Sequence, residues 1–257
     1  MRFQLLLELQ PQLKGREIPI NYQYELSATI YKILAKADTG YAKWLHDNGF
    51  MSENKRFKLF SFSRLIVPRY GIDKERQRLI IHSDFIRWHI TFLPERSTQQ
   101  FVQGVFNDQR IEISDHVSGV SFVIREVQVM PLLKYAPVME FETMSPVCVS
   151  RRNEWGKADY LSPEDSDYAS GLLIGLLARY RALYGHDYKG DTSINFQLLG
   201  KVKPVLVKIK AGTSGQTFVK GYQYKFRLAL AEELMRIAYE GGLGEKCSLG
   251  FGMIKLN

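Results

Sequence analysis

A glycine-rich segment near the C-terminus contains the residues whose type and spacing most plainly suggest chemistry: Gly241-Gly-Leu-Gly-Glu-Lys-Cys-Ser-Leu-Gly-Phe-Gly252. Glycine leaves backbone N–H groups bare, and such groups can cradle a phosphate. The spacing is not that of a Walker A loop, and a predicted helix precedes the segment where a dinucleotide-binding fingerprint needs a strand. Five glycines in twelve residues are costly in conformational entropy, which favours a need for special dihedral angles or close backbone approach over a flexible connection. The residues expected to contact phosphate are Gly242, Gly244, Lys246, Gly250 and Gly252.

Positive charge is concentrated just upstream, between Lys201 and Arg227. This segment has seven Lys or Arg residues and no Asp or Glu, so it holds +7 of the net charge of +8. Apolar and polar residues alternate over 205–210 and 218–228, with a turn at 211–216, which predicts a β-hairpin with an apolar side and a basic side. Edge lysines can serve only solubility, but seven cations without an acidic residue favour a phosphate-binding face. The expected contacts are Lys208, Lys210, Lys225 and Arg227.

The other side chains with reactive groups do not form a metal site in the sequence. The five histidines contain no His-x-x-x-His pair, and the two cysteines, Cys148 and Cys247, are too few for a Cys-based zinc site. Glu164, Asp165 and Asp167 fall in the first turn of a predicted helix, where the helix dipole favours acidic residues. We therefore expect no metal and no cofactor, and a reduced, cytoplasmic protein.

The periodicity of apolar residues predicts the same order of elements twice. Strands are predicted at 3–9, 57–67, 78–93 and 109–130, with helices at 24–37, at 39–48 and from Ser97 onward. After a proline-containing linker at 131–137, a strand is predicted at 138–149, a helix from Ser162 to Gly185, the basic hairpin, a helix at 228–240 and a strand at 251–256. This order indicates an α+β protein of two tandem ferredoxin-like (RRM-like) domains, 1–130 and 138–257, each an antiparallel sheet with helices on one face.

Length and composition agree with that organisation. The chain has 257 residues, of which 45% are hydrophobic and 24% charged, which excludes wholesale disorder. No run approaches about 18–20 apolar residues, and the first residues lack the pattern of a signal peptide, so no membrane span or secretion is expected. The net positive charge indicates a polyanionic partner.

Four segments of the sequence resemble one protein family. GLGEKCSLGFGMIKL at 242–256 is similar to the C-terminal glycine-rich motif of the RAMP superfamily. The segment MSPVCV at 144–149, YLSPEDSDYASGLLIGLLARY at 160–180 and FKLFSFSRL at 57–65 resemble segments of one RAMP subfamily. That subfamily is the CRISPR-associated endoribonuclease that cuts repeat RNA into guide RNAs, the sixth Cas family. Its fold is two ferredoxin-like domains.

The resemblance implies a reaction and a set of residues. Family members cut RNA without a metal by attack of a ribose 2′-OH on the adjacent phosphate, leaving a 2′,3′-cyclic phosphate and a 5′-OH. His46, which precedes Gly49-Phe50, matches the catalytic histidine, and imidazole can give or take a proton at cellular pH. Tyr31 matches its usual tyrosine partner. The lysine that follows the histidine is expected to be Lys55, with Arg56 and Lys58 as other choices.

The same resemblance implies CRISPR repeat RNA as the partner. Lys58, and Arg151 and Arg152 after the Ser-Pro strand, are further expected RNA contacts. A homodimer and a place in a CRISPR effector complex stay open, and no membrane partner is implied. Two alternatives remain: a RAMP protein that binds repeat RNA without cutting it, and an unrelated protein with tandem ferredoxin-like domains.

Overall fold

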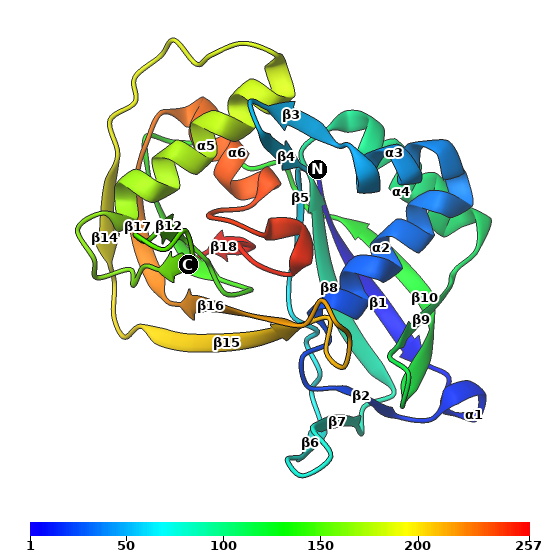
Figure 1. Ribbon diagram of the computed structural model, residues 1–257. Helices are drawn as coiled ribbons and strands as arrows, with labels where there is room; N and C mark the ends of the chain where they lie inside the picture. The colour runs from blue at the N-terminus through cyan, green and yellow to red at the C-terminus, as the bar shows by residue number, and fades with distance from the viewer.

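The first half of the chain folds around a five-stranded antiparallel sheet in the computed structural model, which describes residues 1–257 (Figure 1). The strand order is β5 (Phe60–Phe62), β8 (Phe85–Phe92), β1 (Arg2–Leu9), β10 (Gly119–Val129) and β9 (Arg110–Ser114). Three helices pack on one face: α2 (Gln23–Ala37), α3 (Thr39–Asp47) and α4 (Glu95–Asn107). Alternate residues of β1, such as Phe3 and Leu5, are fully buried beneath them, as the period-2 pattern predicts.

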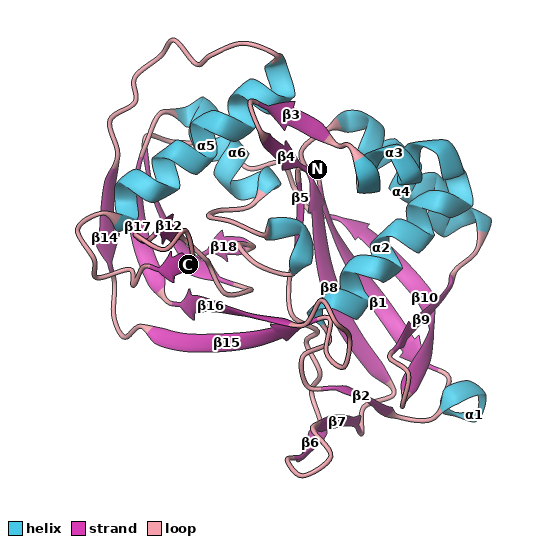
Figure 2. Ribbon diagram, in the orientation of Figure 1, coloured by secondary structure: helices cyan, strands magenta, loops and turns pink.

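The second half repeats this arrangement around a four-stranded sheet (Figure 2). Its order is β14 (Asn195–Leu198), β17 (Lys225–Ala229), β11 (Val138–Thr143) and β18 (Ile254–Leu256). Helices α5 (Tyr168–Tyr184) and α6 (Glu232–Gly241) cover it, and a short 3-10 helix, η1 (Cys247–Leu249), lies in the glycine-rich segment.

Both halves contain additional short helices and strands outside the two main sheets. The first half adds α1 (Pro11–Lys14), a three-stranded sheet of β2 (Glu17–Pro19), β7 (Arg78–Ile81) and β6 (Tyr70–Asp73), and a hairpin of β3 (Phe50–Ser52) and β4 (Lys55–Phe57). The second half adds two hairpins, β12 (Ser150–Arg152) with β13 (Ala158–Tyr160) and β15 (Lys203–Ile209) with β16 (Thr217–Gln223).

Each main sheet has the ferredoxin-like order. If the four strands common to both sheets are numbered in chain order within each half, both sheets have the order 2-3-1-4. In the first half β9 is left out of this numbering and forms an additional edge strand. The predicted fold class is therefore confirmed. Residues 131–137 between the two sheets contain no helix or strand, and the proposed domain boundaries stay predictions.

Three predicted helix starts are wrong, each for a local reason. Helix α5 begins at Tyr168 because Ser162 and Asp165 close a turn, in which the Ser162 N–H donates to Asp165 Oδ2 at 2.6 Å. Helix α4 begins at Glu95, and the hydroxyl of Ser97 instead meets the Tyr41 hydroxyl at 2.5 Å in the core. Helix α6 begins at Glu232 because strand β17 continues through Ala229.

The basic segment also differs from the single hairpin that was predicted. Strand β16 ends at Gln223, and β17 begins at Lys225 in the other sheet. Tyr224 between them is buried: its hydroxyl lies 2.7 Å from the Tyr168 hydroxyl, and its N–H donates to Thr143 Oγ1 at 3.1 Å. The hairpin therefore keeps Lys208 but loses Lys225 and Arg227.

No helix of this fold combines the length and the apolar character that a membrane span requires.

His89 is a buried histidine of β8 that gives the first testable prediction. Its Nδ1 has no hydrogen-bond partner, and burial, with the nearby charges of Arg2 and Arg87, lowers its pKa to about 4. Since an unfolded chain takes up this proton near pH 6.5, stability should fall as pH drops from 6.5 toward 4. We expect wild type to lose roughly 2 kcal/mol more than His89→Gln between pH 7 and 4.5, measured by urea unfolding.

The control for this experiment is His82→Gln, because His82 is exposed. That variant should keep the pH dependence of wild type. If His89→Gln and wild type lose stability in parallel, His89 does not account for the acid sensitivity.

Candidate active site

His46 lies in the last turn of α3, and its side chain is 68% exposed. Asp38 caps the start of this helix by accepting from the Tyr41 N–H, one residue before the predicted cap at Thr39. His46 Nδ1 lies 2.9 Å from Asp47 Oδ1, and this contact, with a second from Lys43, lowers the pKa of Asp47. An ionised carboxylate only accepts, so the Nδ1 atom holds the hydrogen and Nε2 is left for a substrate.

Tyr31, one helix earlier on α2, packs against that imidazole. The two ring centroids are 5.1 Å apart with the planes at 80°, an edge-on arrangement. On its other side Tyr31 contacts Phe60 of β5, with centroids 5.7 Å apart. Burial raises the pKa of Tyr31, which keeps its hydroxyl protonated at neutral pH.

The β3–β4 hairpin brings Lys58 back to the end of α3, next to the backbone of His46. Gly49 ends the helical region with a φ of 66°, and a Cβ there would lie 2.5 Å from the Phe57 carbonyl oxygen, so only glycine fits. The hairpin pairs Phe50 with Phe57, which returns the chain to the level of α3. Lys58 Nζ then donates to the His46 carbonyl oxygen at 2.6 Å, and burial, with the charge of Arg56, lowers the pKa of Lys58.

The lysine expected beside His46 was Lys55, and the structure gives this contact to Lys58 instead. Lys55 is paired with Ser52 at the turn of the hairpin, so the hairpin register takes it away from α3. Arg56, the third choice, donates to the Asp47 carbonyl oxygen at 2.8 Å.

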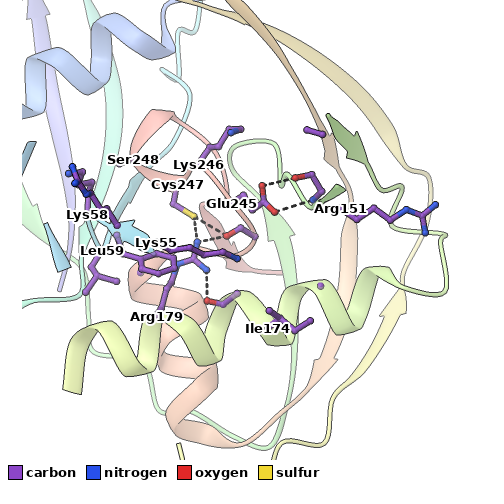
Figure 3. Close-up of a pocket in the computed structure, with 18 of the residues that line it drawn as sticks. Lys55, Lys58, Leu59, Arg151, Ile174, Arg179, Glu245, Lys246, Cys247 and Ser248 are labelled. Atoms are coloured by element: carbon purple, nitrogen blue, oxygen red, sulfur yellow. Dashed lines mark hydrogen bonds between the residues drawn. The ribbon is translucent and has the colours of Figure 1, made fainter. Parts of the chain in front are cut away.

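A cleft of about 820 Å³ opens from Lys58 between the two halves of the molecule (Figure 3). One wall is β4 and the residues after it, and the other comprises β12, α5 and the glycine-rich segment. Seven cations line it: Lys55, Arg56, Lys58, Arg151, Arg152, Arg179 and Lys246. The only acidic residue among the lining residues, Glu245, accepts from the Ser150 N–H and hydroxyl at 3.2 and 2.9 Å. The cleft is therefore strongly positive, and one of its lining residues, Lys58, is the residue that donates to the His46 carbonyl oxygen.

The glycine-rich segment lines part of this cleft, and its glycines are packed tightly against neighbouring residues. A Cβ at Gly252 would overlap the Leu243 carbonyl oxygen, and one at Gly244 would overlap the Cys148 carbonyl oxygen. A Cβ at Gly250 would lie 2.9 Å from Gln23 of α2, and one at Gly242 2.8 Å from Cys247 Sγ. All four glycines have positive φ, so close approach and special dihedral angles both explain them.

The expectation that all these amides hold phosphate needs correction. The Gly250 N–H donates to the Cys247 carbonyl oxygen at 3.2 Å, and the Gly252 N–H donates to the Pro146 carbonyl oxygen at 2.9 Å. These two amides are thus occupied within the protein. Gly244 and Lys246 line the cleft, and their N–H groups have no protein acceptor.

Arg179 of α5 is a cleft residue that the sequence reasoning missed. It is 3% exposed, and its guanidinium donates to the carbonyl oxygens of Gly175 and Gly244 and lies 3.1 Å from Cys247 Sγ. No carboxylate pairs with it, so it fastens the glycine-rich segment to α5 as a buried cation. The signal in the sequence was its spacing, three residues after the buried Leu176 on one helical stripe.

Arg151 and Arg152, two further predicted RNA contacts, differ in whether they are paired with carboxylates. Arg152 lines the cleft without a carboxylate partner, whereas Arg151 lines it paired with Asp159 and Asp167 at 3.2 and 3.0 Å.

The basic hairpin lies outside the cleft lining. Lys210 Nζ lies 5.8 Å from the ring centroid of Tyr24 at the start of α2, and Lys208 Nζ lies 5.7 Å from that of Phe218. Lys225 and Arg227 are on the sheet, where Arg227 pairs with Glu140 at 2.7 Å, so the predicted +7 is not a single free surface.

Comparison with known families covers nearly the whole chain. Residues 17–128 match the family model described as CRISPR-associated protein Cas6, N-terminal, and residues 131–256 match CRISPR associated protein Cas6, C-terminal. The CRISPR-associated endoribonuclease Cas6 1 of Methanocaldococcus jannaschii is 29% identical over 258 residues, covering 99% of this chain and 93% of the relative. The CRISPR-associated endoribonuclease Cas6 of Pyrococcus furiosus is 28% identical, covering 100% of this chain and 90% of the relative.

Solved structures agree over the full length. A structure described as a Cas6-related gene product from Pyrococcus furiosus superposes with a TM-score of 0.83 at 27% identity, covering 100% of this chain and 98% of that one. A second, described as a RAMP protein binding different RNA substrates, has a TM-score of 0.80 at 26% identity, covering 100% and 99%. With both family models matched and the duplicated ferredoxin-like fold in place, the chain belongs to the Cas6 family of CRISPR-associated endoribonucleases in the RAMP superfamily.

Proposed function

We propose that this protein is a metal-independent endoribonuclease that cuts CRISPR repeat RNA into guide RNAs. The attack is by a ribose 2′-OH, and the products carry a 2′,3′-cyclic phosphate and a 5′-OH. The observation that carries this proposal is that His46 packs against Tyr31 and accepts through its carbonyl oxygen from Lys58, which is one of seven cations that line a cleft. The two relatives described above are named as endoribonucleases, which supports the same reaction class.

His46 is proposed as the proton-transferring group. With Nδ1 held toward the Asp47 carboxylate, Nε2 is free to accept the proton of the 2′-OH as it attacks the phosphorus. The Asp47 carboxylate also stabilises the imidazolium that this step creates. Tyr31 packs edge-on against the ring and limits its rotation, and its protonated hydroxyl can donate to a phosphate oxygen.

Lys58 is proposed to serve the phosphate and the leaving group. Its ammonium donates one hydrogen to the His46 carbonyl oxygen, which leaves two for the phosphate oxygens as negative charge accumulates. Because its pKa is lowered, Lys58 releases a proton to the departing 5′-oxygen more readily than an ordinary lysine does. Lys55 is then a phosphate contact further along the cleft rather than part of the reaction.

The test of this function is cleavage of the host's repeat RNA by the whole chain in excess EDTA. We expect one dominant cut per repeat, with the 5′ fragment ending in a cyclic phosphate that resists phosphatase until acid opens the ring. Tight binding without cutting would instead identify a protein that only holds repeat RNA, in an effector complex or alone. Cutting that needs an added divalent metal would contradict the mechanism.

The salt dependence of RNA affinity tests separately whether the RNA follows the cleft. Lys246 lines the cleft, whereas Arg227 is already paired with Glu140. We expect Lys246→Ala to weaken binding and to reduce the slope of log K against log salt by about 0.7, the release expected for one phosphate of a single strand. Arg227→Ala is the matched control and should change the slope little. Equal slopes for wild type and Lys246→Ala would exclude Lys246 from the path.

A further inference from the structure

Trp155 is the most exposed tryptophan of the protein, and it lies beside the cleft. Trp155 is 79% exposed, whereas Trp44 is 39% exposed and Trp88 is fully buried. It sits in the turn that joins β12 to β13, where Gly156 has a φ of 71°. The turn is closed from within, since Asn153 Oδ1 accepts from the N–H groups of Trp155 and Lys157 at 3.1 and 2.9 Å. The backbone that presents the indole is therefore held in place.

Other residues of the hairpin that carries Trp155 line the cleft. Arg152, Gly156 and Ala158 line it from this hairpin, and Ile174 of α5, itself 60% exposed, lines the same wall. The opposite wall at β4 presents Lys55 and Arg56. The cleft thus has cations on both walls, and exposed apolar groups are added on the side of α5 and the β12–β13 hairpin, so it can contact both the phosphates and the bases of a strand.

We propose that Trp155 stacks on an unpaired base of the RNA that occupies the cleft, with Ile174 extending the apolar surface. This inference rests on the proposed function, because it needs RNA in the cleft. An indole offers a large flat face to any base, and stacking of this kind contributes about 1–3 kcal/mol per base. Trp155 is then an RNA-positioning residue that fixes one nucleotide at a set distance from the cut.

Charge favours RNA over a second protein copy as the occupant of this wall. The cleft beside Trp155 is lined by seven cations, and its single acidic residue is held by Ser150. A second copy would bring an equally positive cleft toward the first, whereas a polyanion is attracted.

The experiment measures RNA affinity in a His46→Ala background, so that the RNA stays intact. Trp155→Ala is expected to weaken binding of single-stranded repeat RNA by about 5- to 150-fold, the range that one stacked base implies. Trp155→Phe should bind within about threefold of the parent. Phe106→Ala is the matched control, because Phe106 is 76% exposed but lies on α4 outside the cleft, and it should bind like the parent.

Two further readouts separate stacking from loss of structure. RNA binding should quench tryptophan fluorescence in the parent, and most of that quenching should be absent in Trp155→Phe although it still binds. A single abasic position in the RNA should weaken binding to the parent and have no further effect on Trp155→Ala.

Several results would overturn the inference while leaving the proposed function intact. Parental affinity in Trp155→Ala, or full quenching in Trp155→Phe, would each do so in a protein that binds RNA and cuts it when His46 is present. Unchanged RNA affinity with altered sedimentation of Trp155→Ala would place Trp155 in a protein interface instead. If wild type neither binds nor cuts repeat RNA, the proposed function fails first, and stacking fails with it.

Discussion

Replacing His46 with alanine is expected to slow RNA cleavage by about 10²- to 10⁴-fold while leaving RNA affinity within a few-fold of wild type. The loss corresponds to about 3–5.5 kcal/mol of transition-state stabilisation. The reason is that Nε2 of His46 is the atom proposed to take the proton from the 2′-OH. Single-turnover cleavage with enzyme in excess over RNA measures the chemical step directly.

The variant should fold normally, because the His46 side chain is 68% exposed and its substitution removes little packing. His116→Ala is the matched control, since His116 is also exposed but lies in the loop between β9 and β10. It should cut at the wild-type rate. A His46→Ala protein that cuts within about threefold of wild type would remove His46 from the reaction.

The second large effect concerns the glycine-rich segment and stability rather than chemistry. Gly252→Ala is expected to lower the free energy of unfolding by about 3 kcal/mol. About 1–2 kcal/mol of this comes from the positive φ of 75°, and the remainder comes from the overlap of a Cβ with the Leu243 carbonyl oxygen. Urea unfolding monitored by circular dichroism measures the difference.

Gly185→Ala gives the matched control for this prediction. Gly185 ends α5 with a φ of 77°, but nothing lies within 4 Å of the position where its Cβ would be. Its loss should be about 1 kcal/mol, the dihedral cost alone. If Gly252→Ala and Gly185→Ala prove equally stable, close packing does not explain the glycine at position 252.

Much of the fold could be predicted because local pattern and global topology agree. The alternation of Phe3, Leu5 and Leu7 on β1 and the helical spacing of Leu26, Ile30 and Ile33 on α2 both match the buried faces found in the structure. Helix starts were less predictable. Ser162 and Pro163 have the residue types of a helix start, but a turn closed by Asp165 delays the start of α5 from Pro163 to Tyr168, by five residues.

The site was harder to predict, because its members come together through tertiary structure. His46 and Tyr31 followed from the family resemblance, and the structure places their rings in contact. The choice between Lys55 and Lys58 depended on the register of a hairpin whose two strands have three residues each, which the sequence pattern does not specify. The sequence predicted Arg227 to be a free cation, but in the structure Glu140 of β11 lies opposite it on the neighbouring strand and forms an ion pair with it.

The most direct test of the proposed chemistry is a repeat RNA with a single 2′-deoxyribose at the nucleotide before the cut. Wild-type protein in excess EDTA should bind this RNA as tightly as the all-ribose RNA and fail to cut it, while the all-ribose RNA is cut to completion. Cleavage of the 2′-deoxy RNA at the same bond would show that water or another nucleophile attacks the phosphate, and would contradict the mechanism assigned to His46 and Lys58.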